Sequence, residues 1–505
     1  MALELKKLQN GSDIRGVSLE GVPGEPKTLG SEEARALTRG FIIWLKEKTG
    51  KLPTEMRISV GHDSRLSADA LKETLIYTMM ESGIKVFDCG LASTPAMFMS
   101  TVFEGYKCDG AIMITASHLP FNRNGFKYFS REGGLEKSDI SRIIEIAESE
   151  EMPLSSAPGS VDEMNLIEDY SAYLRNKIIM EVADPEDYEK PLNGLKIVVD
   201  AGNGAGGFYA TRILEPLGAD ITGSQFLNPD GNFPNHEPNP ENKEAMASIS
   251  KAVLTNHADL GLIFDTDVDR SAAVDKNGKE ISRNGIVALA AALIAVEHPG
   301  TTVVTDSITS DQLTDYLEKC LGLKHLRFKR GYRNVINKSI ELNREGIDSQ
   351  LAIETSGHAA YKENNFLDDG AYLATKIVIK EAQLHKKGAD IGVLIESLEE
   401  PKEAIEVRFP IEARDFAIYG DQVLAGLKVW VKANEDKGLS MVEPNYEGVR
   451  INFDLPEVKG WCLLRKSLHD PIMPLNAEVT EGSCETILEI MAAFLDGYSR
   501  IKVRK

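Results

Sequence analysis

A serine, a histidine and a lysine lie close together in residues 110–127. Ser117 and His118 follow an apolar run at 111–114, and a turn rich in proline, asparagine and glycine leads on to Lys127. A serine hydroxyl with a histidine beside it and a lysine nearby could carry a covalent intermediate. The same pattern also fits a polar turn that simply closes a strand, so this stretch alone leaves both interpretations open.

A second loop carries three carboxylates at alternate positions, Asp265, Asp267 and Asp269. Oxygen ligands that converge in this way suit a hard cation, and we predict Mg²⁺. An EF-hand would need glycine after Asp269 and glutamate at the twelfth position, where the chain has Arg270 and Lys276. A haloacid-dehalogenase-type phosphatase would need threonine or valine where Asp269 stands. A solvated acidic turn is the remaining alternative, although its like charges would repel one another without a cation.

A third loop, residues 354–358, combines groups that suit a sugar. Glu354 and Ser356 could hydrogen-bond sugar hydroxyls, and His358 is titratable. A lone histidine is more often a surface residue or a satisfied core residue, so this loop gains meaning only beside the other two.

Cationic residues recur beside glycines at the predicted strand ends. Exposed Arg and Lys are usually only solvated charges. Their clustering in these loops favours phosphate recognition instead. The residues are Arg15 in GSDIRG, Arg65 in HDSR, Arg270, and Lys329, Arg330 and Arg333 in FKRGYR.

The elements that must position these loops are strands alternating with helices. Residues 56–60 and 84–87 read as strands, and 68–80 and 94–102 as helices. An earlier helix is predicted with Ser31 as its N-terminal cap and Gly50 at its end. In open parallel sheets, ligand sites lie at the carboxyl ends of the strands, where the polar loops fall.

The pattern of strand followed by polar loop recurs along the chain. The strands at 57–60, 196–199 and 302–304 precede GHDSR, DAGNG and TDSITS, and those at 111–114, 260–264 and 351–353 precede TASH, DTDVDR and ETSGH. Three divergent copies of one α/β domain explain the recurrence. The alternative is that any α/β protein repeats apolar strands that end in polar loops.

Two composition changes mark further boundaries. A helix at 168–180 is followed by a linker rich in proline and acidic residues. The alternation of strands and helices ends near residues 398–402. Beyond that point, alternating apolar residues predict antiparallel strands and a final helix at 485–495. We therefore predict three related α/β domains with mixed, mainly parallel sheets at 1–158, 159–279 and 280–398, and a C-terminal α+β domain at 399–505.

Composition limits the partners and the compartment. The net charge of −21 argues against nucleic acid and anionic membrane, because both select basic surfaces. Five scattered cysteines without a Cys-x-x-Cys pair indicate reduced thiols. No apolar signal region or membrane span stands out, so a cytoplasmic protein is expected.

The stretch TASHLPFNRNGFK resembles the phosphoserine loop, T-A-S-H-N-P-x-x-x-N-G-x-K, of the α-D-phosphohexomutases, the family of phosphoglucomutase and phosphomannomutase. GSDIRG, NPDGNFPNHEPNPE, DTDVDR and ETSGH also resemble motifs of that family, in the same order along the chain. The resemblance implies four domains, three of them related, around a central cleft.

The resemblance also implies roles for individual residues. Ser117 would carry the phosphoryl group and, with Asp265, Asp267 and Asp269, would bind Mg²⁺. Arg270 would contact the transferring phosphoryl group. The acid and base candidates are His118, Lys127 and His358, and the substrate-binding candidates are Ser12, Arg15, Lys329, Arg333, Glu354, Ser356, Arg465 and Ser467.

The chain departs from the family pattern at its distal phosphate loop. The family has R-x-S-G-T-E-P, whereas residues 465–471 read RKSLHDP. Leucine takes a positive φ only at a cost, so Leu468 predicts a different turn, in which Lys466 or His469 would act as donors. Leu119, which replaces an asparagine beside the serine, is a second departure. Both bear on substrate identity more than on reaction type.

We expect an isomerase that interconverts hexose 1-phosphate and hexose 6-phosphate, glucose ahead of mannose, through a hexose 1,6-bisphosphate that also serves as activator. A hexose 1,6-bisphosphate synthase, a metal-dependent phosphatase and a catalytically silent sugar-phosphate sensor are the alternatives. The phosphatase fails at Asp269, and a sensor would have no need to keep Ser117 and Lys127. A monomer or homodimer is expected.

Overall fold

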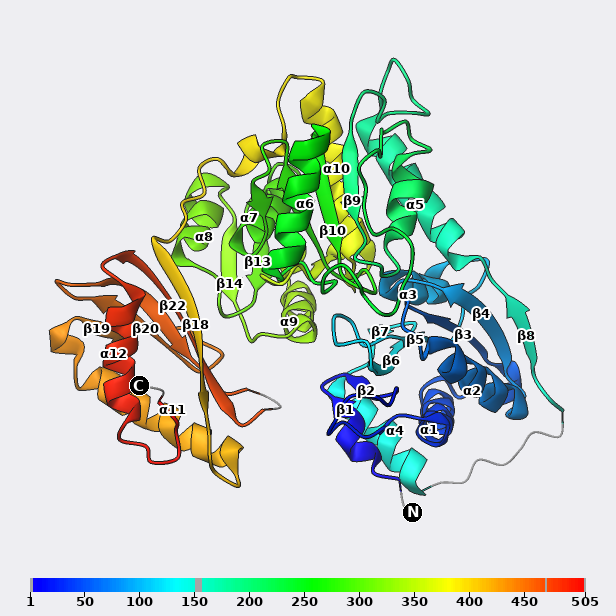
Figure 1. Cartoon of the computed structure of the whole chain (residues 1–505), viewed down its shortest axis with the longest axis horizontal. Coiled ribbons are helices and arrows are strands. Elements are labelled where there is room, and N and C mark those ends of the chain that lie inside the picture. The colour runs from blue at the N-terminus through cyan, green and yellow to red at the C-terminus, as the bar shows by residue number, and fades with distance from the viewer. Residues whose placement is uncertain (1–2, 150–156, 468–469, 504–505) are drawn as a thin grey trace. The chain divides into compact units, whose positions relative to one another are not determined.

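The computed structural model of the chain describes residues 3–149, 157–467 and 470–503. The chain forms two compact units, Met1–Leu293 with Ser356–Ile395, and Ile294–Thr355 with Glu396–Lys505. The yellow helix α10 in Figure 1 therefore belongs to the first unit, although it follows strands of the second unit in sequence. Helix α7 (Asn284–Ala295) contains the first point at which the chain passes from one unit to the other.

The first unit begins with a mixed sheet in the order β1-β2-β6-β5-β3-β4-β8, with β7 paired to β6. Strands β5, β3, β4 and β8 run parallel. The strands are β1 (Gln9–Asn10), β2 (Asp13–Val17), β3 (Arg57–His62), β4 (Lys85–Leu91), β5 (Gly110–Ile114), β6 (Arg123–Ser130), β7 (Gly133–Gly134) and β8 (Ser160–Glu163). The helices are η1 (Leu5–Leu8), α1 (Ser31–Thr49), η2 (Pro53–Glu55), α2 (Ala68–Glu81), α3 (Thr94–Val102) and α4 (Lys137–Ser149).

Helix α1 shows how the sequence sets local structure in this unit. Apolar residues three and four apart, among them Phe41 and Leu45, face the core and are fully buried. Burying each such side chain stabilises the fold by roughly 1.5–3 kcal/mol. Gly50 ends the helix with φ 71°, as expected. The predicted cap was wrong: the N-cap is Gly30, whose amide donates to Glu33 Oε2 at 2.8 Å, and Ser31 is already helical.

The same unit contains a second sheet in the order β12-β11-β10-β9, against which α6 and α10 pack (Figure 1). Strands β9 and β10 are parallel, and β10 and β11 form a hairpin. The strands are β9 (Ile197–Asp200), β10 (Leu260–Phe264), β11 (Ser271–Asp275) and β12 (Glu280–Ile281), and β16 (Ala359–Tyr361) pairs antiparallel with β17 (Leu367–Asp368). The remaining helices of this unit are α5 (Leu166–Val182), η3 (Tyr209–Leu214), α6 (Lys243–Asn256), η5 (Lys362–Asn364), α10 (Gly370–His385) and η6 (Ile391–Ile395).

The second unit combines a parallel and an antiparallel region. Strands β13 (Thr302–Thr305), β14 (Lys324–Arg327) and β15 (Leu351–Ile353) are parallel, with helices α8 (Asp311–Asp315), η4 (Tyr316–Cys320) and α9 (Tyr332–Arg344). The C-terminal sheet is antiparallel in the order β18-β22-β21-β20-β19, as predicted. Its elements are β18 (Glu403–Pro410), α11 (Phe416–Lys432), η7 (Glu435–Lys437), β19 (Leu439–Met441), β20 (Val449–Asp454), β21 (Lys459–Leu464), β22 (Ile472–Glu481) and α12 (Cys484–Leu495).

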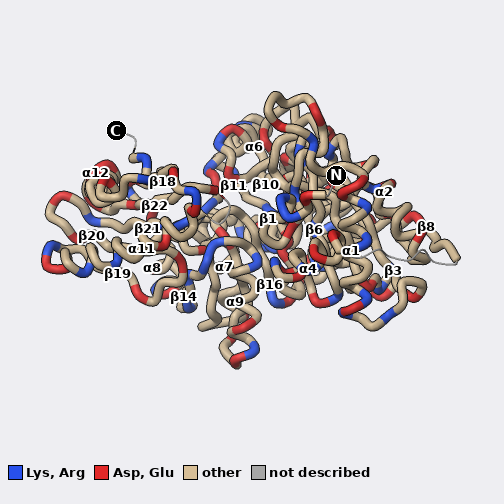
Figure 2. The backbone as a smooth tube through the Cα atoms, turned by 90° about the horizontal axis from the view of Figure 1, so that it is seen from below, with Lys and Arg blue, Asp and Glu red and all other residues tan. Residues whose placement is uncertain are grey.

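Charged residues of both signs are distributed along the chain. Figure 2 shows Lys and Arg interspersed with Asp and Glu, so the net charge of −21 is not confined to one segment. Within the described parts of the chain, no helix has both the length and the apolar character needed to cross a lipid bilayer.

Candidate active site

Ser117 lies in the loop that follows β5, in the first unit, and its backbone is left-handed with φ 51°. Its amide donates to Thr115 Oγ1 at 2.9 Å, and that hydroxyl donates to Asp63 Oδ2 at 2.7 Å. A left-handed backbone is unfavourable for a residue other than glycine, and such conformations cluster at functional sites. The buried hydrogen bonds hold the serine in this conformation.

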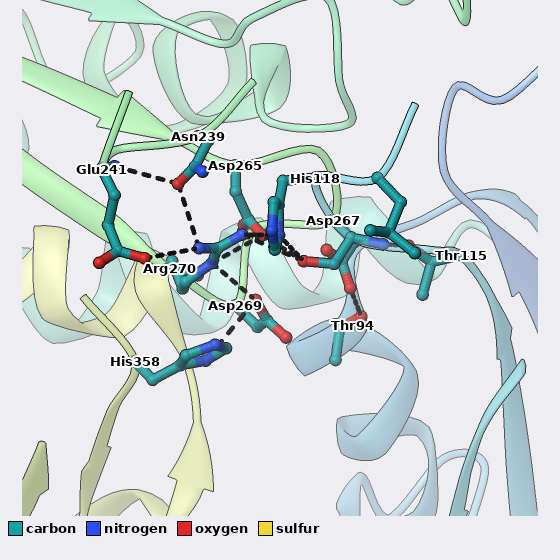
Figure 3. A network of polar contacts seen from close by, with 12 residues as sticks. Thr94, Thr115, His118, Asn239, Glu241, Asp265, Asp267, Asp269, Arg270 and His358 are labelled. Carbon is teal, nitrogen blue, oxygen red and sulfur yellow. Dashed lines mark hydrogen bonds and ion pairs between the residues drawn. The ribbon is translucent and has the colours of Figure 1, made fainter. Parts of the chain in front are cut away.

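The Ser117 hydroxyl contacts both acidic and basic groups. Its Oγ donates to Asp265 Oδ2 at 3.1 Å and accepts from Arg270 Nη2 at 3.2 Å. His118 Nδ1 lies 3.3 Å from the same oxygen. Figure 3 shows His118, Asp265 and Arg270 directed toward one another at this point. An oxygen in this setting can receive an anionic group whose charge the arginine would stabilise.

Arg270 connects the serine loop to the second sheet. Its Nε donates to Asp265 Oδ2 and its Nη1 to Asn239 Oδ1, both at 3.1 Å, and Nη2 lies 2.6 Å from His118 Nδ1. Because a guanidinium only donates, His118 Nδ1 must accept, and the ring is neutral with its proton on Nε2. Burial and the charge of Arg270 lower the pKa of His118 to about 2, in agreement with that tautomer.

The three predicted aspartates lie in the turn that joins β10 to β11. Val268 stands at the centre of this turn with φ 67°, an unusual conformation for a β-branched residue. The Arg270 amide donates to Asp265 Oδ1 at 3.2 Å. The tight hairpin therefore gathers the alternate carboxylates and Arg270 at one end of the sheet.

The aspartates have the oxygen set that a hard divalent cation requires. One ligand atom from each of Asp265, Asp267 and Asp269 lies within 4.8 Å of the others. Oδ1 of Asp267 and Oδ1 of Asp269 are buried and have no hydrogen-bond partner among the described residues. Burial and the charge of Asp269 raise the pKa of Asp265. Buried carboxylates this close together fit Mg²⁺, which would supply the missing partners.

Lys127 on β6 and Thr94 at the start of α3 also reach these carboxylates. Lys127 Nζ donates to Asp267 Oδ2 at 2.9 Å and forms a short ion pair with Asp269. Thr94 bonds Asp267 twice, through its hydroxyl to Oδ2 and through its amide to the main-chain oxygen at 2.8 Å. Burial alone would raise the pKa of Asp269, but the charges of Lys127, His358 and Arg270 more than offset it and hold that pKa below its ordinary value.

His358 lies against the same hairpin. Gly357, with φ 92°, brings its loop so close that an added Cβ would lie 2.5 Å from Ser271 O. His358 Nδ1 lies 2.6 Å from Asp368 Oδ2 and 3.8 Å from Asp269 Oδ1. Burial lowers the pKa of His358, but Asp368 and Asp269 more than offset this and raise it to about 9. The ring is therefore an imidazolium at neutral pH.

Three of the predicted substrate-binding residues also belong to the first unit. Arg15 Nη1 donates to Ala116 O at 3.1 Å, next to Ser117, and Nη2 pairs with Asp13 at 2.9 Å. Ser12 lies between β1 and β2 and is partly buried. Ser356 is buried two residues before His358.

The other five predicted substrate-binding residues, Lys329, Arg333, Glu354, Arg465 and Ser467, belong to the second unit. Buried Glu354 accepts from the Gly331 amide at 2.6 Å, and Arg333 lies in the first turn of α9. Lys329 is exposed.

Arg465 and Ser467 come from the stretch that we predicted to bind the distal phosphate. Burial and the charge of Arg330 lower the pKa of Arg465. Ser467 Oγ accepts from the Asp470 amide at 3.2 Å. Lys466 pairs with Asp421 at 2.6 Å, so its ammonium already has an anionic partner. Leu468 and His469, for which we predicted an altered turn and a donor, lie outside the described residues.

The site includes residues that sequence reasoning did not single out. Thr94 holds Asp267, and Asn239 and Glu241 contact Arg270 (Figure 3). Asp368 pairs with His358. Asn239 and Glu241 fall within NPDGNFPNHEPNPE, which was noted only as a resemblance. Thr94 carried no local signal, because a threonine at a helix start is common whatever it contacts.

Comparison with known families assigns three consecutive segments. Residues 6–153, 168–278 and 282–399 match the phosphoglucomutase/phosphomannomutase alpha/beta/alpha domains I, II and III. The predicted α/β fold with three related domains and a further sheet domain is thereby confirmed.

Relatives match over nearly the whole length. A phosphomannomutase/phosphoglucomutase of Pseudomonas syringae pv. tomato is 30% identical and covers 96% of this chain and 94% of its own. A phosphoglucomutase/phosphomannomutase of Thermococcus kodakarensis is 31% identical, covering 97% and 98%. The crystal structure of a phosphoglucomutase/phosphomannomutase family protein from Burkholderia thailandensis superposes with a TM-score of 0.76 at 26% identity, over 96% of each chain.

Proposed function

The chain belongs to the phosphoglucomutase/phosphomannomutase family of isomerases, and on this premise we propose that it interconverts hexose 1-phosphate and hexose 6-phosphate by passing a phosphoryl group through Ser117. Glucose phosphates are the proposed first substrates and mannose phosphates the second. A hexose 1,6-bisphosphate is the intermediate, and it reverses its orientation before the serine recovers a phosphoryl group.

One observation carries this proposal: the Ser117 hydroxyl lies within 3.2 Å of both Asp265 and Arg270. A phosphoserine has about −1.5 to −2 charges, so a sugar hydroxyl attacks it only where that charge is compensated. Arg270 contacts the serine oxygen directly, and Lys127 and His358 contact the adjacent carboxylates. Such a fixed array stabilises charge on the transferring group without reorganisation.

Asp265, Asp267 and Asp269 are the residues that would hold Mg²⁺, which when bound supplies positive charge for the phosphoryl oxygens. The chain's own residues handle the proton. His118 presents a protonated Nε2, because Arg270 occupies its Nδ1. His358 is charged and can give a proton, and Lys127 is the third acid–base candidate.

Substrate recognition is proposed for two groups of residues. The Glu354 carboxylate and the Ser356 hydroxyl would hydrogen-bond sugar hydroxyls, because both groups make directional contacts. The cations would hold the phosphate that is not being transferred. These are Arg15 with Ser12 in the first unit, and Lys329, Arg333 and Arg465 with Ser467 in the second.

Intact-mass measurement and a coupled assay test the proposal. The purified protein should carry a phosphate-sized adduct that is absent in Ser117→Ala and retained in Ser149→Ala, a control at an exposed serine. With hexose bisphosphate present, glucose 1-phosphate should be isomerised faster than mannose or glucosamine 1-phosphate. Steady release of phosphate would indicate a hydrolase, accumulation of bisphosphate a synthase, and the absence of both adduct and turnover a sensor.

A further inference from the structure

The side chain of Arg65 is fully enclosed in the loop that follows β3. Its two terminal nitrogens donate to main-chain oxygens on the serine loop, at 2.5–2.9 Å. Nη2 bonds the oxygens of Ser117 and Leu119, and Nη1 those of Pro120 and Arg123. Four N–H groups therefore have four carbonyl partners, and none of these is left for a phosphate. The prediction that Arg65 recognises phosphate is not supported by these contacts.

We propose that Arg65 is a positioning residue for phosphoryl transfer, which holds the backbone of the serine loop so that the Ser117 hydroxyl and the His118 amide face the phosphoryl group. The inference rests on the proposed function of Ser117. An arginine suits this task because its planar fork bonds several fixed acceptors at once, whereas an ammonium is a single point.

Asp63 extends this hold to the other side of Ser117. Its Oδ2 lies 3.3 Å from Arg65 Nε, and its Oδ1 accepts from the Arg65 amide at 2.9 Å. The same Oδ2 accepts from the Thr115 hydroxyl, which in turn accepts from the Ser117 amide. Both the N–H and the C=O of Ser117 are thus tied to the Asp63–Arg65 pair, which accounts for its unusual φ of 51°.

The orientation of the Ser117 carbonyl has a consequence for the next amide. In a trans peptide the C=O and the following N–H point in opposite directions. Because the Ser117 oxygen points to Arg65, the His118 N–H points away from it, and this amide has no hydrogen-bond partner among the described residues. A main-chain donor beside the nucleophile suits an anionic oxygen.

The stretch NPDGNFPNHEPNPE covers Arg65 from the second sheet's side of the first unit. The Phe233 ring lies 5.3 Å from the guanidinium carbon. A Cβ on Gly231 would lie 2.5 Å from Ser64 O and 2.6 Å from Leu66 N, so the two loops meet backbone to backbone. This close cover excludes water from the guanidinium and strengthens its bonds to the carbonyls.

Arg131, whose side chain is half exposed, provides a control in the same unit. Arg131 does not bond the serine loop. Like Arg65, it bonds carbonyls and an aspartate: Cys108 O at 3.1 Å, Lys107 O at 2.5 Å and Asp109 at 3.0 Å. These partners lie just before β5, whereas the partners of Arg65 lie after it.

Arg65→Lys and Arg131→Lys, made in the full chain, test the inference. Lysine keeps the charge beside Asp63 but cannot serve four carbonyls. In Arg65→Lys, kcat and the single-turnover rate of Ser117 phosphorylation by hexose 1,6-bisphosphate should fall about 100-fold, with KM changed less than about threefold, because a small misplacement of reacting groups costs that much. Arg131→Lys should stay within about twofold of the wild type in each measurement.

Thr115→Val and Thr115→Ser keep the test decisive if Arg65→Lys does not fold. Valine removes the link from Ser117 to Asp63 and should slow transfer about tenfold, while serine restores the link and the rate. Wild-type transfer rates in folded Arg65→Lys or Thr115→Val would overturn the inference alone. A wild-type protein that takes no phosphoryl group on Ser117 would overturn the proposed function and the inference with it.

Discussion

The residues around Ser117 in the first unit and the predicted phosphate-binding residues Arg465 and Ser467 in the second unit differ in how fully their polar groups are bonded. Ser117, Asp267 and Arg270 are almost fully buried, and each bonds groups from other elements. In the second unit, Arg465 Nε is buried without a hydrogen-bond partner among the described residues, and Ser467 Oγ accepts from the amide of its near neighbour Asp470. The first region joins charged groups from several elements and leaves two carboxylate oxygens without a partner, whereas the second leaves a guanidinium donor without one among the described residues.

The difference separates reaction type from substrate choice. Phosphoryl transfer needs charges held in place before the substrate arrives, since reorganisation would add to the barrier. Recognition of the distal phosphate needs donors that become bonded only when the ligand binds. On the proposed function, the chemistry would take place in the first region, and the loop at Arg465 would distinguish substrates. Three experiments test this contrast, and a fourth tests the stability of the first unit.

Asp267→Asn should have the largest effect and should fall on the chemistry. It weakens the contacts of Asp267 with Lys127 and Thr94 and removes one proposed Mg²⁺ ligand. We expect kcat to drop on the order of 10³-fold with a thermal midpoint near that of the wild type. A coupled assay and differential scanning calorimetry measure both. Turnover within tenfold of the wild type would contradict the proposed role of Asp267 in the chemistry.

Arg465→Ala should act mainly on binding. Loss of a charged donor to the distal phosphate should raise KM about 10- to 100-fold and leave kcat within about fivefold. Steady-state kinetics over a range of hexose 1-phosphate measures the split. Arg408→Ala is the control, because Arg408 is exposed and pairs with Glu406. A lower kcat at unchanged KM would show that the second region also takes part in the chemistry.

Gly231→Ala tests whether the cover over Arg65 supports the first region. The added Cβ would meet main-chain atoms of Ser64 and Leu66, so the loop must shift. We expect kcat to fall about tenfold, less than for Arg65→Lys, because the Gly231 loop can shift while the Arg65 guanidinium keeps its bonds to the serine loop. Gly105→Ala, where a Cβ would meet nothing within 4 Å, should be silent. Equal activity of the two variants would contradict the close approach.

Glu381 gives the smallest effect, on stability and not on turnover. Burial raises its pKa to about 7, while the Ile391 amide donates to its Oε2 at 2.9 Å. A carboxyl whose pKa is higher in the folded state binds its proton more tightly there, so stability should fall as pH rises from about 4.5 through 7. Glu381→Gln should remove this dependence and gain about 1–3 kcal/mol at pH 8. Thermal midpoints that respond identically to pH in both proteins would contradict it.

Much of the site was readable from short stretches of sequence. The serine loop, the alternate aspartates and the strands that lead into them are each local, so residue order and the period of apolar residues sufficed to predict the strands, the confirmed α/β class and, through the resemblance, the confirmed family. The predicted N-cap at Ser31 failed because Glu33 reaches back to Gly30, a choice between two adjacent residues that propensity alone does not make.

Only the tertiary structure decided which charges meet. Lys127 bonds Asp267 from 140 residues away and Thr94 bonds it from 173, because a crossover connection and a second sheet bring their elements together. Arg65 looked like one of several loop cations, and only its four carbonyl partners show what it holds. Sequence determines what a residue can donate or accept, whereas its partner is determined by topology, which brings together groups that are remote along the chain.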